Sequence, residues 1–121
     1  MIKAMILAAA ALTMGTAADA QTMIQKNDIK VENHLMTPEA LWAMGRIGGA
    51  EASPNGKQVV YQVGYYSVKE NKGHQMLFIM DANGKNKKAL TTDAKSETDA
   101  AWIQGGQKIA FIRDGQLWSM N

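Results

Sequence analysis

One unit of turn and strand is written twice in this sequence, and the repeat limits what the chain can fold into. Ala52–Tyr61 and Trp102–Phe111 both read as a turn closed by glycine, a polar pair and a short apolar strand, at an offset of 50 residues. Leu77–Asp81 and Leu117–Asn121 also match, at an offset of 40. The difference falls after Tyr61, where the first copy has a long excursion over 65–75.

A period of 40 to 50 residues with about four short strands per unit is typical of β-propeller blades. We therefore predict an all-β fold, an incomplete β-propeller with one full four-stranded blade plus most of a second. A signal-peptide helix and one short helix should precede it. The expected strands are 51–53, 58–65, 75–81 and 87–91 in the first blade, and 99–103, 107–112 and 116–120 in the second.

The predicted organisation is a signal peptide at 1–20, a lead-in at 21–50 with a short helix near 38–45, blade 1 at 51–97 and a partial blade 2 at 98–121. A single blade exposes two apolar faces, which only stacked neighbours cover, and a propeller needs at least four blades to close. We therefore expect the chain to stop in the middle of a blade, as a fragment of a longer protein. A small independent sandwich is the structural alternative, and a natural 121-residue product is the alternative in length.

Turn residues separate the predicted strands. Asn-Gly at 83–84 predicts a two-residue turn, because both residues tolerate positive φ. The other turn positions are listed by blade: Ser53, Pro54, Asn55 and Gly56 in the first, Gly105 and Gly106 in the second.

The first twenty residues have the pattern of an export signal. Lys3 is followed by an apolar run from Ala4 to Met14, which is too short to span a bilayer. The small residues at 18–20 predict cleavage between Ala20 and Gln21, and hence a secreted or periplasmic protein with no membrane span after cleavage. A buried N-terminal helix and an uncleaved anchor are the alternatives. Downstream, Thr37 and Pro38 predict a helix start, and Gly45–Gly49 should end that helix.

Several kinds of chemistry are not indicated by this composition. With no cysteines, disulfides and Cys-ligated metals are excluded, and a net charge of +2 gives no reason to expect nucleic acid. His34 and His74 are too far apart to form a metal-binding motif. The serines lie in no nucleophile elbow. We therefore expect no catalytic residue, no metal and no cofactor in this chain.

Two tyrosines are the only candidates for contact with a substrate. Tyr65 and Tyr66 begin the excursion after the second strand, and long loops on a rigid scaffold often carry binding groups. A variable surface hairpin is the alternative reading. Lys85, Lys87 and Lys88 are interpreted as a solvated hairpin tip, and the three tryptophans as packing residues.

The blade residues resemble a known family. Ser53-Pro54-Asn55-Gly56-Lys57, Val59-Val60-Tyr61, Leu77-Phe78-Ile79-Met80-Asp81-Ala82-Asn83-Gly84 and Ala89-Leu90-Thr91 resemble the blade repeat of TolB-like propellers and of the prolyl oligopeptidase family. Leu35-Met36-Thr37-Pro38-Glu39-Ala40-Leu41-Trp42 with Gly45-Arg46-Ile47 is similar to the N-terminus of bacterial secreted peptidases of that family, nearest to the dipeptidyl-peptidase-5-like and acylaminoacyl-peptidase-like branch. Asn55 stands where the repeat usually has Asp.

This resemblance implies a parent that is a secreted serine exopeptidase of the dipeptidyl or oligopeptidase type. Its propeller would gate the access of peptides to an α/β-hydrolase domain carrying a Ser-Asp-His triad. The partners expected for this chain are that hydrolase domain, the remaining blades and, through the parent, peptide substrates. The alternative is a non-enzymatic periplasmic propeller of the TolB type that binds a protein partner.

Overall fold

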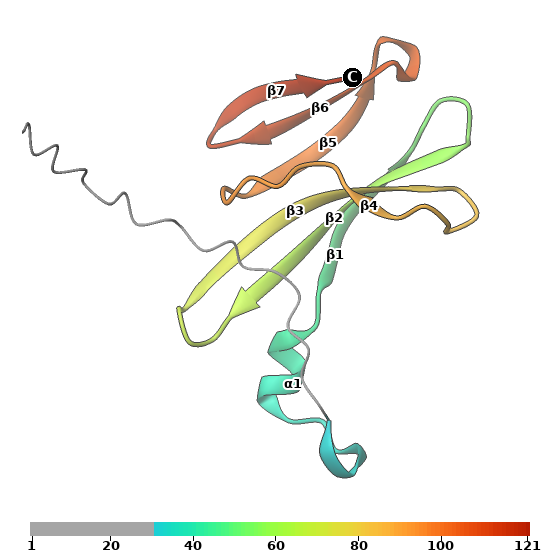
Figure 1. The fold of residues 1–121 in the computed structure, drawn as a ribbon. Coiled ribbons are helices and arrows are strands. Elements are labelled where there is room, and N and C mark those ends of the chain that lie inside the picture. Colours follow the sequence, from blue (N-terminus) through green and yellow to red (C-terminus); the bar gives the residue numbers. More distant parts are fainter. Residues whose placement is uncertain (1–30) are drawn as a thin grey trace, which may run out of the picture.

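A computed structural model of the chain describes residues 31–121, which form two antiparallel sheets with little helix (Figure 1). The first sheet has the order β1-β2-β3-β4 and the second β5-β6-β7. The mostly β prediction is therefore confirmed. The elements are η1 (Glu32–His34), α1 (Pro38–Ala43), β1 (Arg46–Ala52), β2 (Gln58–Ser67), β3 (Lys72–Asp81), β4 (Lys88–Ala89), β5 (Glu97–Ile103), η2 (Gln104–Gly106), β6 (Lys108–Arg113) and β7 (Gln116–Met120).

The expected signal segment at 1–20, its cleavage point at Ala20 and Gln21, and the start of the lead-in lie outside the described residues. Within residues 31–121, no helix is long and apolar enough to cross a membrane.

The two sheets pair their strands in the same register. Glu51 pairs with Val60 in the first sheet, and Ala101 pairs with Ala110 in the second, 50 residues further on. The next pair of strands repeats this agreement at the offsets of 50 and 40 seen in the sequence: the pairs Val59–Met80, Val60–Ile79, Tyr61–Phe78 and Gln62–Leu77 correspond to Ile109–Met120, Ala110–Ser119, Phe111–Trp118 and Ile112–Leu117. Ala52–Tyr61 and Trp102–Phe111 thus occupy equivalent structural settings.

The sheets pack through opposite faces of this common unit. Val60 and Ile79 of the first sheet form the core with Ile109 of the second, and Trp102 and Met120 pack against them. Because side chains alternate between the faces of a strand, the counterpart of the Ile109 face in the first sheet is its other face, the one that carries Val59. The contact is therefore head to tail: one face of the first unit meets the opposite face of the second.

The first strand begins earlier than the sequence predicted, at Arg46 and not at residue 51. Because Gly48 and Gly49 weaken a helix, the sequence predicts that the helix ends there and that the first strand begins only at residue 51. The two glycines are accommodated here because β1 pairs with β2 only, and an extra residue bulges between Ile47 and Gly49. β5 has a similar irregularity between Thr98 and Ala101.

The excursion over 65–75 is regular structure. β2 and β3 pair without interruption from Gln58–Asp81 to Ser67–Lys72, so Tyr65 and Tyr66 belong to a strand and not to a loop. The sequence prediction missed this because polar residues at the hairpin tip look like a loop when the pairing partner is unknown.

Side-chain hydrogen bonds close the first turn. The buried Ser53 hydroxyl donates to Asn55 Oδ1 at 2.7 Å and accepts from the Gln58 amide at 3.0 Å. Asn55 Oδ1 also accepts from the Lys57 amide at 3.0 Å. Both roles of Asn55 use a side-chain oxygen as acceptor, so Asn replaces the Asp usual in the repeat without loss.

The turn after β3 differs from the prediction. Among the described residues, Gly84 has a φ of 82°, but Asn83 is not at positive φ. The Gly84 amide donates to the Asp81 carbonyl at 2.8 Å, and the Asp81 amide donates to the Lys85 carbonyl at 2.9 Å. This is a type I turn followed by a left-handed glycine, and Asn83 contributes by accepting the Lys85 amide through its side chain.

The short helix α1 begins as predicted and ends at Ala43, two residues before the predicted end. Thr37 Oγ1 accepts from the Ala40 amide at 3.1 Å, and Pro38 occupies the first turn. Ala40 is the buried residue of the helix, and the helix packs against β2.

Candidate functional site

Tyr65, one of the two candidate residues, lies within the first sheet. Its ring meets Phe78 edge-on at 6.5 Å, and Tyr61 stacks on the same Phe78 at 5.5 Å. A Cβ on Gly45 would come within 2.8 Å of the Tyr65 ring, so the backbone after α1 lies directly against this side chain. Burial, with a smaller contribution from Tyr61, raises the pKa of Tyr65, which stays protonated at neutral pH. Tyr65 is thus mainly a packing residue.

Tyr66 points to the other face of β2, where it meets an arginine. The Arg46 guanidinium carbon lies 4.9 Å from the centre of the Tyr66 ring and 4.8 Å from that of Trp42. Trp42 and Tyr66 contact each other edge-on at 5.6 Å. We call Trp42, Arg46 and Tyr66 the arginine cage. The structure therefore places the two candidate tyrosines on opposite faces and not in one site.

A second cluster, which the sequence did not reveal, lies at the junction of the two sheets. Glu97 is only 1% exposed and accepts hydrogen bonds from Arg113, whose Nε is at 2.8 Å, and from the Thr91 hydroxyl. Asp93 lies 3.4 Å from Arg113 as a second acidic partner. Glu97 and Arg113 are opposite each other on β5 and β6. This pair fixes the connection between the sheets.

Burial raises the pKa of the Glu97 carboxyl, although the hydrogen bond from Arg113 opposes the rise. Arg113 also lies over the rings of Trp118 at 4.9 Å and Phe111 at 5.3 Å. His74 joins the same junction from β3, with Nε2 at 3.2 Å from the Lys95 carbonyl, and the Ser96 hydroxyl accepts the Gln75 amide at 3.0 Å. These contacts tie the loop over 90–96 to β3 of the first sheet.

Ser67 and Asp114 have structural partners. Ser67 accepts the Glu70 amide at the hairpin tip, and Asp114 pairs with Lys95. His34 lies in η1 and His74 in β3. No group of three or more His, Cys, Asp or Glu residues suited to holding a metal ion occurs within residues 31–121.

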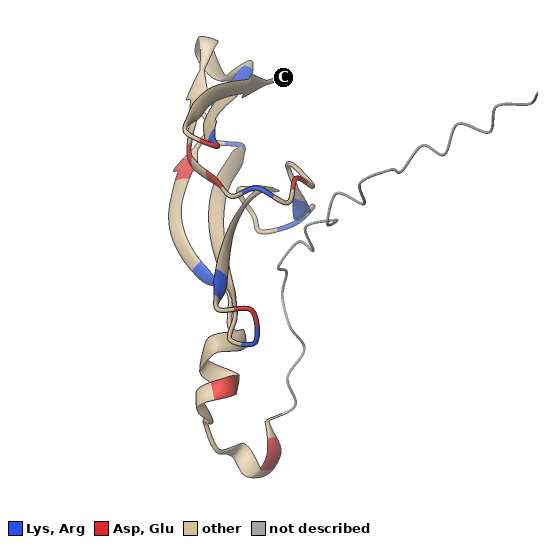
Figure 2. Ribbon diagram, turned by 90° about the vertical axis from the view of Figure 1, so that its left-hand side faces the viewer, with Lys and Arg blue, Asp and Glu red and all other residues tan. Residues whose placement is uncertain are grey.

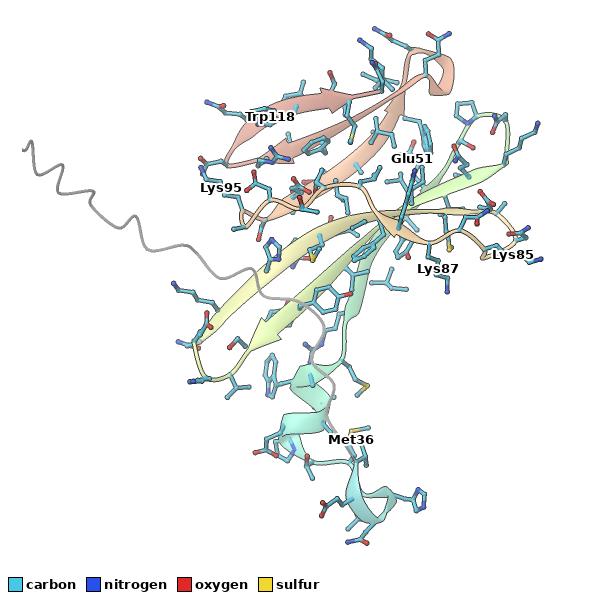
Figure 3. All side chains as sticks on the ribbon, viewed as in Figure 1. Met36, Glu51, Lys85, Lys87, Lys95 and Trp118 are labelled. Atoms are coloured by element: carbon cyan, nitrogen blue, oxygen red, sulfur yellow. The ribbon has the colours of Figure 1, made fainter. Side chains whose placement is uncertain are left out.

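Charge is distributed without a patch of one sign. Figure 2 shows basic and acidic residues interspersed along the described ribbon. Lys85 and Lys87 project from the loop that follows β3, near one end of the first sheet (Figure 3). Lys85, Lys87 and Lys88 are all exposed, which fits a solvated tip.

A hollow of about 340 Å³ lies where the first strands of the two sheets approach each other. Gly48, Gly49 and Glu51 of β1 line it from one side and Asp99 of β5 from the other. Gln62 lines it too, and its Oε1 accepts the Asp99 amide at 3.2 Å. The Trp102 indole donates to the Glu51 carbonyl at 3.1 Å, so the same two strands are also bonded directly.

The described residues therefore define a protein of stacked, repeated antiparallel sheets. Their polar and aromatic clusters join one sheet to the next or to the lead-in. Such an arrangement builds interfaces and a scaffold.

Two curated relatives give this class a family context. The chain is 43% identical over 81 residues to a protein named Dipeptidyl-peptidase 5 from Porphyromonas endodontalis. The matched segment covers 67% of this chain and 12% of that protein. The chain is 35% identical over 77 residues to a protein of the same name from Porphyromonas gingivalis, covering 64% of this chain and 11% of the relative. No protein-family model matches the chain. The chain is thus a partial homologue of dipeptidyl-peptidase 5 proteins, and it matches only about a tenth of their length.

Proposed function

We propose that the two sheets are the first two blades of a β-propeller belonging to an exported peptidase that removes dipeptides from the N-termini of peptides. The propeller gates the access of peptides to an α/β-hydrolase domain outside this chain. The peptide bond is cleaved there by a Ser-Asp-His triad through an acyl-enzyme. Export rests on the signal pattern at 1–20, and the peptidase activity on the two relatives named Dipeptidyl-peptidase 5.

One comparison carries the propeller proposal. Leu77 and Leu117 occupy the same register position in the two sheets, yet Leu77 is 0% exposed and Leu117 is 75% exposed. The second sheet covers the Leu77 face. In the proposed propeller, a third unit covers the equivalent Leu117 face in the same way. A head-to-tail contact between like units continues until it closes into a ring or extends as a filament. A ring of four to eight such blades is a propeller.

The activity is tested with the full-length protein. A dipeptide joined to a fluorogenic amine is the substrate, and the same compound with a blocked N-terminus is the control. We expect release of the amine from the free-amino substrate only, and loss of turnover with a serine-directed inhibitor. The 121-residue chain assayed alone should give no turnover. A full-length protein without turnover that binds a protein partner would instead support the TolB-like alternative.

A further inference from the structure

The hollow between the two sheets is bordered by the free edges of their first strands. Within residues 31–121, β1 pairs only with β2, and β5 pairs only with β6. The backbones of β1 and β5 approach each other, whereas those of β4 and β7 do not. The sheets therefore come together at their first strands and diverge toward their last ones. In a ring of such sheets, the edge formed by the first strands faces the central channel.

Small residues form much of the wall of this hollow. Gly48, Gly49 and Ala50 lie along β1, and Ala100 lies on β5. A Cβ added to Gly49 would meet nothing within 4 Å, so there is open space beside this strand. The volume of about 340 Å³ is within the usual range of ligand sites, about 300–1,000 Å³. A ligand can therefore approach the backbone of β1 closely.

Two carboxylates line the hollow, and no lysine or arginine lines it with them. Glu51 pairs with the core residue Val60, so its side chain lies on the face that meets the second sheet, and Figure 3 shows it between the sheets. Within the described part of the chain, the Glu51 carboxylate has no hydrogen bond or ion pair. The Asp99 carboxylate accepts the Thr98 hydroxyl at 2.8 Å and has no cationic partner there. The negative charge in the hollow is therefore not neutralised by these residues.

The repeated unit does not require either carboxylate. At the offset of 50 residues, Glu51 corresponds to Ala101, and Asp99 corresponds to Gly49. Each sheet thus forms with a small neutral residue at the position where the other sheet carries an acid. The two acids come together only at the junction, on opposite sides of the hollow. The fold of the single sheets does not explain this placement, whereas a cationic ligand in the hollow does.

We infer that the hollow binds a primary ammonium group of peptides that pass along the propeller channel. An ammonium group has three donors, and Glu51 and Asp99 supply charged acceptors for two of them. Gln62 Oε1 accepts the Asp99 amide and has a second lone pair for the third donor. The N-terminus of a peptide and a lysine side chain share this chemistry. The inference rests on the part of the proposed function in which peptides pass through the propeller.

Carbodiimide coupling in the full-length protein tests this inference. The reagent joins a carboxylate to a primary amine in contact with it, which forms an amide and releases a urea. The probe is tetra-alanine amide with a free N-terminus, added after treatment with a serine-directed inhibitor so that it is not hydrolysed. Mass spectrometry identifies the modified residues.

We expect labelling of Glu51 or Asp99 to saturate as the concentration of the probe rises. Glu70, an exposed carboxylate at the β2–β3 tip, is the matched control and should be labelled without saturation. Equal labelling behaviour of the control and of both carboxylates in the hollow would overturn the inference. Coupling of Glu51 to a lysine of the protein itself, in place of the probe, would also overturn it.

Competitors separate the two sources of the ammonium group. Acetylated tetra-alanine amide has no ammonium group and should leave the labelling unchanged, and competition by this peptide would contradict the inference. The same acetylated peptide with one lysine competes if the site accepts a lysine side chain. If it does not compete, the site is selective for the N-terminus.

A pair of variants tests the role of charge. Glu51→Gln changes an exposed side chain that has no partner in residues 31–121, so the variant should fold. It should raise the half-saturating probe concentration for labelling of Asp99 about two- to fivefold, as expected for loss of one exposed ion pair. Glu70→Gln should leave this concentration unchanged, and equal values in the two variants would refute a role for Glu51. Peptidase turnover is measured separately without inhibitor: saturable labelling without turnover refutes only the proposed activity, and turnover without saturable labelling refutes only the ammonium site.

Discussion

Truncation of Leu117 is the sharpest test of the stacked-blade arrangement. In residues 31–121 this side chain is 75% exposed, so Leu117→Ala should change the stability of a free-standing unit by less than about 0.5 kcal/mol. If a third blade covers it, its environment becomes that of Leu77, which is 0% exposed. Removing a leucine side chain from such a site costs about 2–5 kcal/mol.

Native-state hydrogen exchange of the full-length protein measures this difference. A cost of about 2–5 kcal/mol should speed exchange of the β6 and β7 amides by roughly 30-fold to several thousand-fold, since about 1.4 kcal/mol corresponds to a factor of ten. Leu77→Ala should have a comparable effect on β2 and β3. Val68→Ala, at an exposed tip, is the control and should change exchange by less than about threefold. If Leu117→Ala behaves like Val68→Ala in the full-length protein, no blade covers that face and the propeller proposal fails.

Three further predictions concern the described residues, and each is measured by urea unfolding. The folded-state pKa of Glu97 is raised, so its contribution to stability is greatest at low pH and is lost as pH rises from the ordinary glutamate pKa through the folded-state pKa. Glu97→Gln should remove this loss, and an unchanged pH slope would contradict the assigned cause. Thr37→Ala removes the cap of α1 and should cost about 1 kcal/mol, with Thr37→Ser restoring most of it; equal stability of all three proteins would show that the cap contributes nothing. Gly106→Ala should lower the stability by at least about 1 kcal/mol, because Gly106 has a φ of 90° and an added Cβ would lie 3.0 Å from Pro54. The control Gly49→Ala should cost less, because nothing lies within contact distance of an added Cβ there. A larger cost for Gly49→Ala would refute the argument from backbone strain.

The parts of the fold that the sequence predicted are those encoded locally. The turn at Ser53–Gly56, the start of α1 at Thr37 and the alternation along β2 depend on residues within a few positions of one another. The start of β1 was missed because Gly48 and Gly49 are poor in any regular element, and only pairing with β2 makes them extended. The hairpin arms around 65–75 were missed for the same reason.

The two clusters could not be predicted because their members meet only after the sheets have formed. Glu97 and Arg113 are opposite each other across β5 and β6, and a charged pair gives no apolar pattern by which to recognise it as buried. The arginine cage needs the angle between α1 and β2. Tyr66 was singled out, but as part of a loop, and nothing in the sequence indicated that an arginine would lie against its ring.

The connection between the sheets explains why the two units differ at one position. Glu97 and Arg113 of the second unit correspond, at an offset of 50, to Ile47 and Val63 of the first. In the second unit the polar loop over 90–96 crosses this position, and its Thr91 and Asp93 bond to the ion pair.

In the first unit the lead-in takes the place of that loop. A Cβ on Gly45 would lie 2.8 Å from Val63, so the backbone that follows α1 packs on the counterpart of Arg113, whereas Ile47, the counterpart of Glu97, is 72% exposed. A buried ion pair contributes little net stability, but it accepts few alternative arrangements. Its place at the crossing between the two sheets therefore favours one position of the connecting loop on the second sheet.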